Sequence, residues 1–113
     1  MVSAPQVANL PADQIEESRA RLRGEVLASG GQAPTVTIYW GPVDGGTTAS
    51  AWANQEDLGG LPGGAFDVTV NSLTAGQTYY YRAHAANDGG AVWAPESLSF
   101  TTTEAHTAVG PHW

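Results

Sequence analysis

Apolar and polar residues alternate with a period of two along most of this chain. Between residues 18 and 27, small or apolar residues alternate with three arginines and a glutamate. Successive side chains of a β-strand point to opposite faces, so this pattern predicts a strand with one buried face. The same alternation recurs at 35–40, 66–71 and 78–87, and in a last segment at 92–102 that Pro95 interrupts. The pattern therefore predicts a series of short, half-buried strands.

Runs of Gly, Pro, Asn and Asp separate the predicted strands. Asn87–Gly90 favours a tight hairpin turn, because these residue types tolerate the positive backbone angles that such turns require. A short strand is predicted at 47–52, whereas the Gly-rich segment 54–64 is predicted as a loop. Residues 5–17 favour a broken edge strand, and a short helix is the alternative.

Six or seven short strands with turn signals between them are typical of an all-β fold. The predicted architecture is an antiparallel β-sandwich of two sheets and about seven strands. Residues 18–102 would form the sandwich, flanked by an N-terminal segment at 1–17 and a C-terminal tail at 103–113. The inward positions predict a core of Leu22, Val26, Val36, Ile38, Trp40, Phe66, Val68, Val70, Leu73, Tyr79, Tyr81, Leu98 and Phe100.

The segment from Leu73 to Tyr79 has the spacing of a known motif. A leucine, a turn with Gly76 and a tyrosine six residues after the leucine occur in the same arrangement in fibronectin type III domains. The chain resembles this family, one of the immunoglobulin-like sandwiches, over residues 20–102. The resemblance implies that Tyr79 forms a corner, with its hydroxyl bonded to backbone near the turn. It also implies a structural, scaffold or adhesive module, as in repeats of large secreted or surface bacterial proteins.

A specific strand pairing also follows from the resemblance. If the strand at 18–27 pairs with the strand at 66–71, Arg21 and Arg23 lie beside Asp67 on the outer face.

Composition and charge narrow the classes of partner. The chain has 113 residues and a formal net charge of −7, with only 4 Lys and Arg residues. These values exclude nucleic acid, because binding to phosphates requires clustered cations. No apolar run is long enough to insert into a membrane, and the first residues lack the features of a signal peptide. Charged residues make up 13% of the chain against the usual ~25%, which indicates an exported protein or a subunit covered by neighbours.

The residues that could carry chemistry form no known catalytic or metal-binding pattern. No cysteine is present, and His84, His106 and His112 lack the spacing of a zinc site. No serine lies in a nucleophile motif, and adjacent carboxylates such as Glu16 and Glu17 diverge on a strand. The sequence therefore predicts a protein that is not an enzyme and has no catalytic, metal or cofactor site.

Two functions follow as hypotheses. The first is a structural module of an extracellular or cell-surface assembly, packed head to tail through its termini and sheet edges as a fibre subunit or tandem repeat. Its partners would be copies of itself or neighbouring domains. The alternative is a carbohydrate-binding or adhesive module, in which exposed aromatic rings stack on sugars or anchor an interface. The candidate interaction residues are Trp52, Tyr80, Trp93 and Trp113, and Tyr39 is a further aromatic residue whose burial the pattern leaves open.

Overall fold

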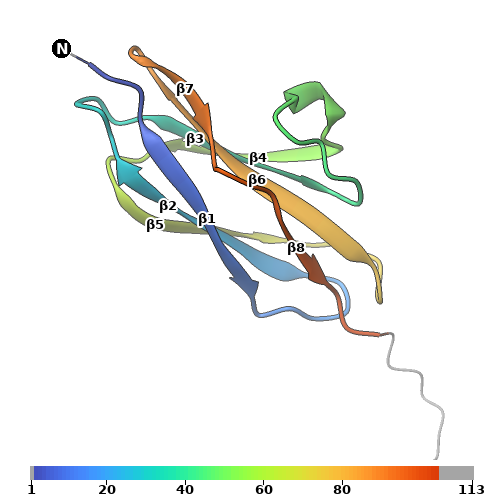
Figure 1. Cartoon of the computed structure of the whole chain (residues 1–113). Coiled ribbons are helices and arrows are strands. Elements are labelled where there is room, and N and C mark those ends of the chain that lie inside the picture. The colour runs from blue at the N-terminus through green and yellow to red at the C-terminus, as the bar shows by residue number, and fades with distance from the viewer. Residues whose placement is uncertain (1, 105–113) are drawn as a thin grey trace, which may run out of the picture.

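The computed structural model describes residues 2–104, which form two antiparallel sheets packed face to face (Figure 1). The three-stranded sheet has the strand order β1-β2-β5 and consists of β1 (Gln6–Asp13), β2 (Ala20–Ala28) and β5 (Gly64–Val70). The predicted all-β sandwich is therefore confirmed, and residues 6–13 form an edge strand rather than a helix.

The second sheet has five strands. Three of them lie side by side in the order β4 (Asn54–Gly60), β3 (Thr35–Gly41) and β6 (Thr78–Asn87). Two short strands, β7 (Gly90–Trp93) and β8 (Leu98–Thr101), pair one after the other with the remaining edge of β6. Pro95 lies between β7 and β8, where the predicted interruption of the last strand occurs.

Strand β2 shows how the alternating sequence fills the space between the sheets with side chains. Every second residue from Ala20 to Val26 is buried, and the arginines between them are only partly buried. Gly24 lies opposite Phe66 of β5, and a Cβ at position 24 would come within 2.5 Å of the Phe66 ring. The glycine therefore makes room for an aromatic ring in the core.

The core contains side chains from both sheets. The ring of Tyr79 stacks on Phe100 with centroids 5.7 Å apart and meets Trp40 edge-on at 6.0 Å. Of the residues expected in the core, Val68 and Leu98 are partly buried and pack against it. The others are buried: Leu22, Val26, Val36, Ile38, Trp40, Phe66, Val70, Leu73, Tyr79, Tyr81 and Phe100.

The Tyr79 hydroxyl closes the turn before β6. It accepts a hydrogen bond of 2.8 Å from the backbone N–H of Thr74. The ring itself is buried, and Leu73 is buried beside the turn. This is the tyrosine corner that the resemblance implies.

The segment between β3 and β5 differs from the sequence prediction. The strand predicted at 47–52 is wrong, because residues Ala49–Ala51 form one turn of 3₁₀ helix. The loop predicted at 54–64 is also wrong in its first part, which forms the edge strand β4. Most β4 side chains are polar or glycine and exposed, and within residues 2–104 its backbone pairs only with β3. Backbone pairing needs no apolar alternation, so periodicity could not reveal this strand.

Candidate functional site

An aromatic cluster lies on the outer face of the five-stranded sheet. Tyr39 on β3, His84 on β6 and Trp93 on β7 are all partly exposed. His84 and Trp93 are direct partners across the β6–β7 pairing, with ring centroids 4.8 Å apart. Tyr39 lies 5.0 Å from Trp93 and 6.1 Å from His84. We call these three residues the aromatic cluster.

Polar side chains continue this face across the sheet. Thr37 of β3 lies between Asp57 of β4 and His84 of β6, and Tyr39 lies between Gln55 and Arg82 in the next row. Because alternate residues of a strand share a face, both rows point outward with the aromatic cluster. The face therefore places a carboxylate, a carboxamide and a guanidinium around two aromatic rings.

Hydrogen bonds fix two of these polar groups. Oδ1 of Asp57 accepts hydrogen bonds from Thr37 Oγ1 at 3.3 Å and from Gln55 Nε2 at 3.0 Å. Nε of Arg82 donates to the backbone carbonyl of Ala94 at 2.8 Å. Both side chains are thus held in place by hydrogen bonds within the protein.

Burial among these rings affects the charge of His84. Desolvation lowers the pKa of the His84 imidazole from its usual value, so the ring is neutral at pH 7. The outer face therefore carries one cation, Arg82, and one carboxylate, Asp57, among the side chains of the two rows described above.

The candidate interaction residues have different environments. Trp93 belongs to the aromatic cluster, and Tyr80 is partly exposed on the same face, opposite Ser99 of β8. Trp113 lies outside the described residues. The expectation that Trp52 is exposed for interaction is wrong, because this residue is only 7% exposed. It packs on Gly45, and its indole N–H donates to the carbonyl of Gly46 at 3.1 Å, so it fastens the β3–β4 loop.

The alternating pattern of residues 78–87 predicts that His84 points outward, but it does not predict the contact of His84 with Trp93. The signal was present in the predicted hairpin turn at Asn87–Gly90. Counting outward from the pair Asn87 and Gly90, three further residues on each side bring His84 opposite Trp93. A two-residue turn fixes the register in this way.

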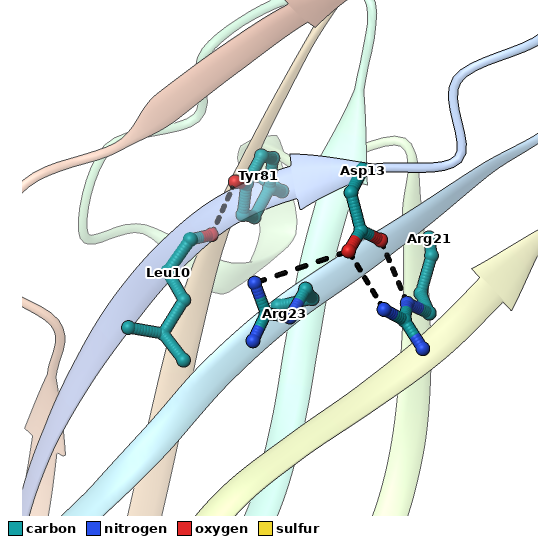
Figure 2. Close-up of polar contacts among 5 residues, drawn as sticks. All are labelled: Leu10, Asp13, Arg21, Arg23 and Tyr81. Atoms are coloured by element: carbon teal, nitrogen blue, oxygen red, sulfur yellow. Dashed lines mark hydrogen bonds and ion pairs between the residues drawn. The ribbon is translucent and has the colours of Figure 1, made fainter.

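Strand β1 is fastened to both sheets, as Figure 2 shows. Asp13 accepts two hydrogen bonds of 2.7 Å from Arg21 of β2 and lies 3.9 Å from Arg23. These hydrogen bonds hold the pKa of the Asp13 carboxyl below its usual value. On the other side, the Tyr81 hydroxyl of β6 donates to the carbonyl of Leu10 at 2.6 Å. Burial raises the pKa of this hydroxyl to about 12.

Arg23 also lies directly opposite Asp67 in the β2–β5 pairing. This neighbourhood was predicted, whereas the ion pair of Arg21 with Asp13 of β1 was not. The reason is that the prediction left the register of residues 5–17 open.

Asn9 of β1 reaches the edge of β6 at the gap between β7 and β8. Its Oδ1 accepts a hydrogen bond of 2.8 Å from the Ala83 N–H. Its Nδ2 donates to the carbonyl of Glu96 at 2.6 Å and to that of Tyr81 at 3.4 Å. The Asn9 carboxamide thus replaces backbone partners that the strand break removes.

The N-terminal segment is bound by hydrogen bonds at one end of the sandwich. The Ser3 N–H donates to the Gly30 carbonyl at 2.8 Å, and Asn87 Nδ2 donates to the Ser3 carbonyl at 2.8 Å. A Cβ on Gly30 or on Gly89 would collide with the backbone of Ser3, and Gly30 also has a positive φ of 77°. Both glycines therefore allow the close approach of this segment.

An apolar groove of about 280 Å³ lies near the same end. Leu27 is 56% exposed, which is high for a large apolar side chain. The groove, called the β1–β7 groove below, is lined by Pro5, Gln6, Val7, Leu27, Val92, Trp93 and Pro95.

Residues 2–104 contain no group of three or more His, Cys, Asp or Glu side chains arranged to hold a metal ion. Within the same residues, no helix is long and apolar enough to cross a membrane.

Solved structures share this arrangement of strands. The sixth fibronectin type III domain of human fibronectin type III domain containing protein 3 matches with a TM-score of 0.60 over 97% of this chain and 91% of that chain. Its sequence identity is 21%. The chain has a fibronectin type III-like fold. The sensor domain of the anti-sigma factor RsgI4 in Pseudobacteroides cellulosolvens matches this fibronectin type III-like domain with a TM-score of 0.62. That match has 16% identity and covers 93% of this chain and 100% of that chain.

A third similar structure is a fibronectin type III domain derived from the human KIAA0970 protein, with a TM-score of 0.57 and 15% identity. It covers 96% of this chain and 85% of that chain. No family model matches the sequence, and no curated protein matches it significantly. The likeness is therefore one of fold alone.

Proposed function

We propose that this fibronectin type III-like domain is a structural module of an extracellular or cell-surface assembly, joined end to end with neighbouring domains or copies of itself. The arrangement of the chain ends carries this proposal. The described chain begins beside the tip of the β6–β7 hairpin, and it leaves after β8 at the opposite end of the sandwich (Figure 1). Ends at opposite poles allow modules to follow one another in a line.

The N-terminal attachment supports a role in series. Ser3 is held by Gly30 and Asn87, and β1 follows directly after this segment. Because β1 pairs with β2 and is also bonded to β6, a pull on the N-terminal segment is distributed over both sheets. An N-terminal segment bonded in this way suits a module that transmits force or keeps a fixed orientation.

The β1–β7 groove offers a contact surface at the same end. A neighbour that covers Leu27 and the adjacent prolines would remove apolar area from water. The low content of charged residues is consistent with such coverage. The structural neighbours show this fold both as one of several domains in a protein and as a sensor domain, so they do not choose between these uses.

The proposal is tested with the full chain, with a chain that ends at Glu104, and with the Leu27→Asp variant. Ending at Glu104 keeps the hydrogen bonds of Thr103 to Glu16 and Gly76. Light scattering and electron microscopy of concentrated samples report assembly between copies. X-ray scattering of two copies fused end to end reports a fixed interdomain orientation. We expect assembly or a fixed orientation in the full chain and its loss in Leu27→Asp.

Two results would contradict the proposal. Full-length chains that stay monomeric at high concentration argue against a fibre subunit. Fused copies that move independently, with no effect of Leu27→Asp, argue against a tandem repeat. The chain that ends at Glu104 shows whether residues 105–113 contribute to the contact.

A further inference from the structure

We propose that the outer face of the five-stranded sheet binds a neutral oligosaccharide, with sugar rings against Trp93 and Tyr39 and hydroxyl groups bonded to Asp57, Gln55 and Arg82. This activity differs from the proposed end-to-end packing, because its polar groups Asp57 and Gln55 lie on β4, outside the lining of the β1–β7 groove. Trp93 belongs to both surfaces.

The aromatic cluster supplies the stacking surface. Trp93 and Tyr39 are partly exposed, so part of each ring faces solvent. The apolar C–H face of a sugar packs on an aromatic ring because it leaves water and meets the negative ring face. The two rings are inclined by 43°. Because the two rings do not lie in one plane, they fit a soluble, bent oligosaccharide better than the flat surface of a crystalline polysaccharide.

The polar groups match the hydroxyls of a sugar. A hydroxyl both donates and accepts hydrogen bonds, so a sugar site needs acceptors and donors around the stacking ring. Asp57 uses Oδ1 for Thr37 and Gln55, and its Oδ2 has no hydrogen-bond partner among residues 2–104. The terminal nitrogens of Arg82 are likewise without a protein partner within the described part of the chain. Acceptors and donors are thus available on both sides of Tyr39.

The charges on this face favour a neutral ligand. Arg82 and Asp57 balance each other, and His84 is neutral at pH 7. The other arginines, at positions 19, 21 and 23, belong to the opposite sheet or precede it. An acidic polymer would therefore meet one cation on a chain whose formal net charge is −7. A peptide would be better served by the apolar β1–β7 groove than by this polar face.

The test begins with an array of soluble neutral oligosaccharides, including glucans, xylans, mannans, galactans and chitin fragments. The full chain is compared with Trp93→Ala, Tyr39→Ala and Asp57→Asn by calorimetry against the best ligand. We expect each alanine variant to bind about tenfold more weakly or worse, since one stacking contact contributes on this scale. NMR should show shifts of the Trp93 indole N–H and of the amides of β3 and β6.

Leu27→Ala is the matched control, because it removes exposed apolar surface from the groove that Trp93 also lines and changes no residue of the aromatic cluster. It should bind like the parent chain. Trp93→Tyr keeps a ring and should recover part of the affinity, which separates lost stacking from lost folding. The absence of any saccharide ligand, an undiminished affinity of Trp93→Ala, or ligands that are only peptides would overturn the proposal.

Discussion

The carboxamide of Asn9 bonds to the backbone of Ala83, 74 residues later in the chain and in the other sheet. The two sheets are therefore joined by a polar side chain as well as by the apolar core. We expect Asn9→Ala to lower the free energy of unfolding by about 1–3 kcal/mol, because it leaves the Ala83 N–H without its partner. Urea denaturation followed by fluorescence measures this change.

Asn71→Ala serves as the control for that substitution. Asn71 is exposed at the end of β5, so its replacement should change stability by no more than about 0.5 kcal/mol. Equal losses in the two variants would show that the Asn9 bridge contributes nothing specific.

Tyr81 should make the fold sensitive to strong alkali. Its pKa of about 12 lies above the unfolded value of 10.0, so the folded state binds more protons between these values. Stability from this group is complete below pH 10 and is lost as the pH rises through about 12. Denaturation between pH 9 and 12 should show a steeper loss for the parent chain than for Tyr81→Phe.

Tyr81→Phe should also cost about 0.5–1.5 kcal/mol at neutral pH, because the Leu10 carbonyl loses its hydrogen bond. Tyr80→Phe is the matched control on the same strand, with a partly exposed ring on the outer face. If Tyr81→Phe were as stable as the parent chain, the Leu10 contact would have no net effect.

His84 should make the fold weaker in mild acid. Its folded pKa lies below 6.5, so the unfolded chain binds more protons once the pH falls through that value. Stability is therefore highest above pH 6.5 and decreases as the pH falls toward the folded pKa. The measurement is best made on a chain that ends at Glu104, because this removes His106 and His112.

An NMR titration of the remaining imidazole gives the folded pKa directly. His84→Gln should flatten the stability profile between pH 7 and 5. A folded pKa at or above 6.5 would contradict the effect of burial among Tyr39 and Trp93.

Gly24→Ala should destabilise the domain by about 1–3 kcal/mol, because the added methyl group collides with Phe66 in a packed core. Gly63→Ala is the control, since a Cβ there meets nothing within 4 Å. Thermal unfolding compares the two. The double variant Gly24→Ala with Phe66→Leu should lose less than the sum of the single changes, and strict additivity would disprove the collision.

The strands in which apolar and polar residues alternate could be predicted from the sequence. Residues of β2, β3, β5 and β6 alternate because one face of each strand meets the core, and Tyr79 is identified by its distance from Leu73. Strand β4 escaped prediction because its pairing to β3 uses backbone groups, which leave no pattern in side chains.

The outer face could be predicted only in part. Trp93 and Tyr39 were recognisable as aromatic residues of uncertain burial, but Trp52 is equally aromatic and is buried by the loop that folds over it. The alternation of apolar and polar residues indicates burial only within strands. It therefore does not predict the burial of Trp52, which lies in a loop. The contact of Asn9 with Ala83 depends on the tertiary packing of β1 against β6, for which the local sequence holds no signal.

The interruption of the last strand at Pro95 also bears on aggregation. An unbroken edge strand offers a row of free backbone groups on which a second chain can extend the sheet. Here β7 and β8 contain four residues each, and at the break between them the Asn9 carboxamide bonds to the Ala83 N–H of β6 and to the Glu96 carbonyl. At this edge, crowded copies of the domain lack a continuous template for sheet growth, which disfavours amyloid-like association.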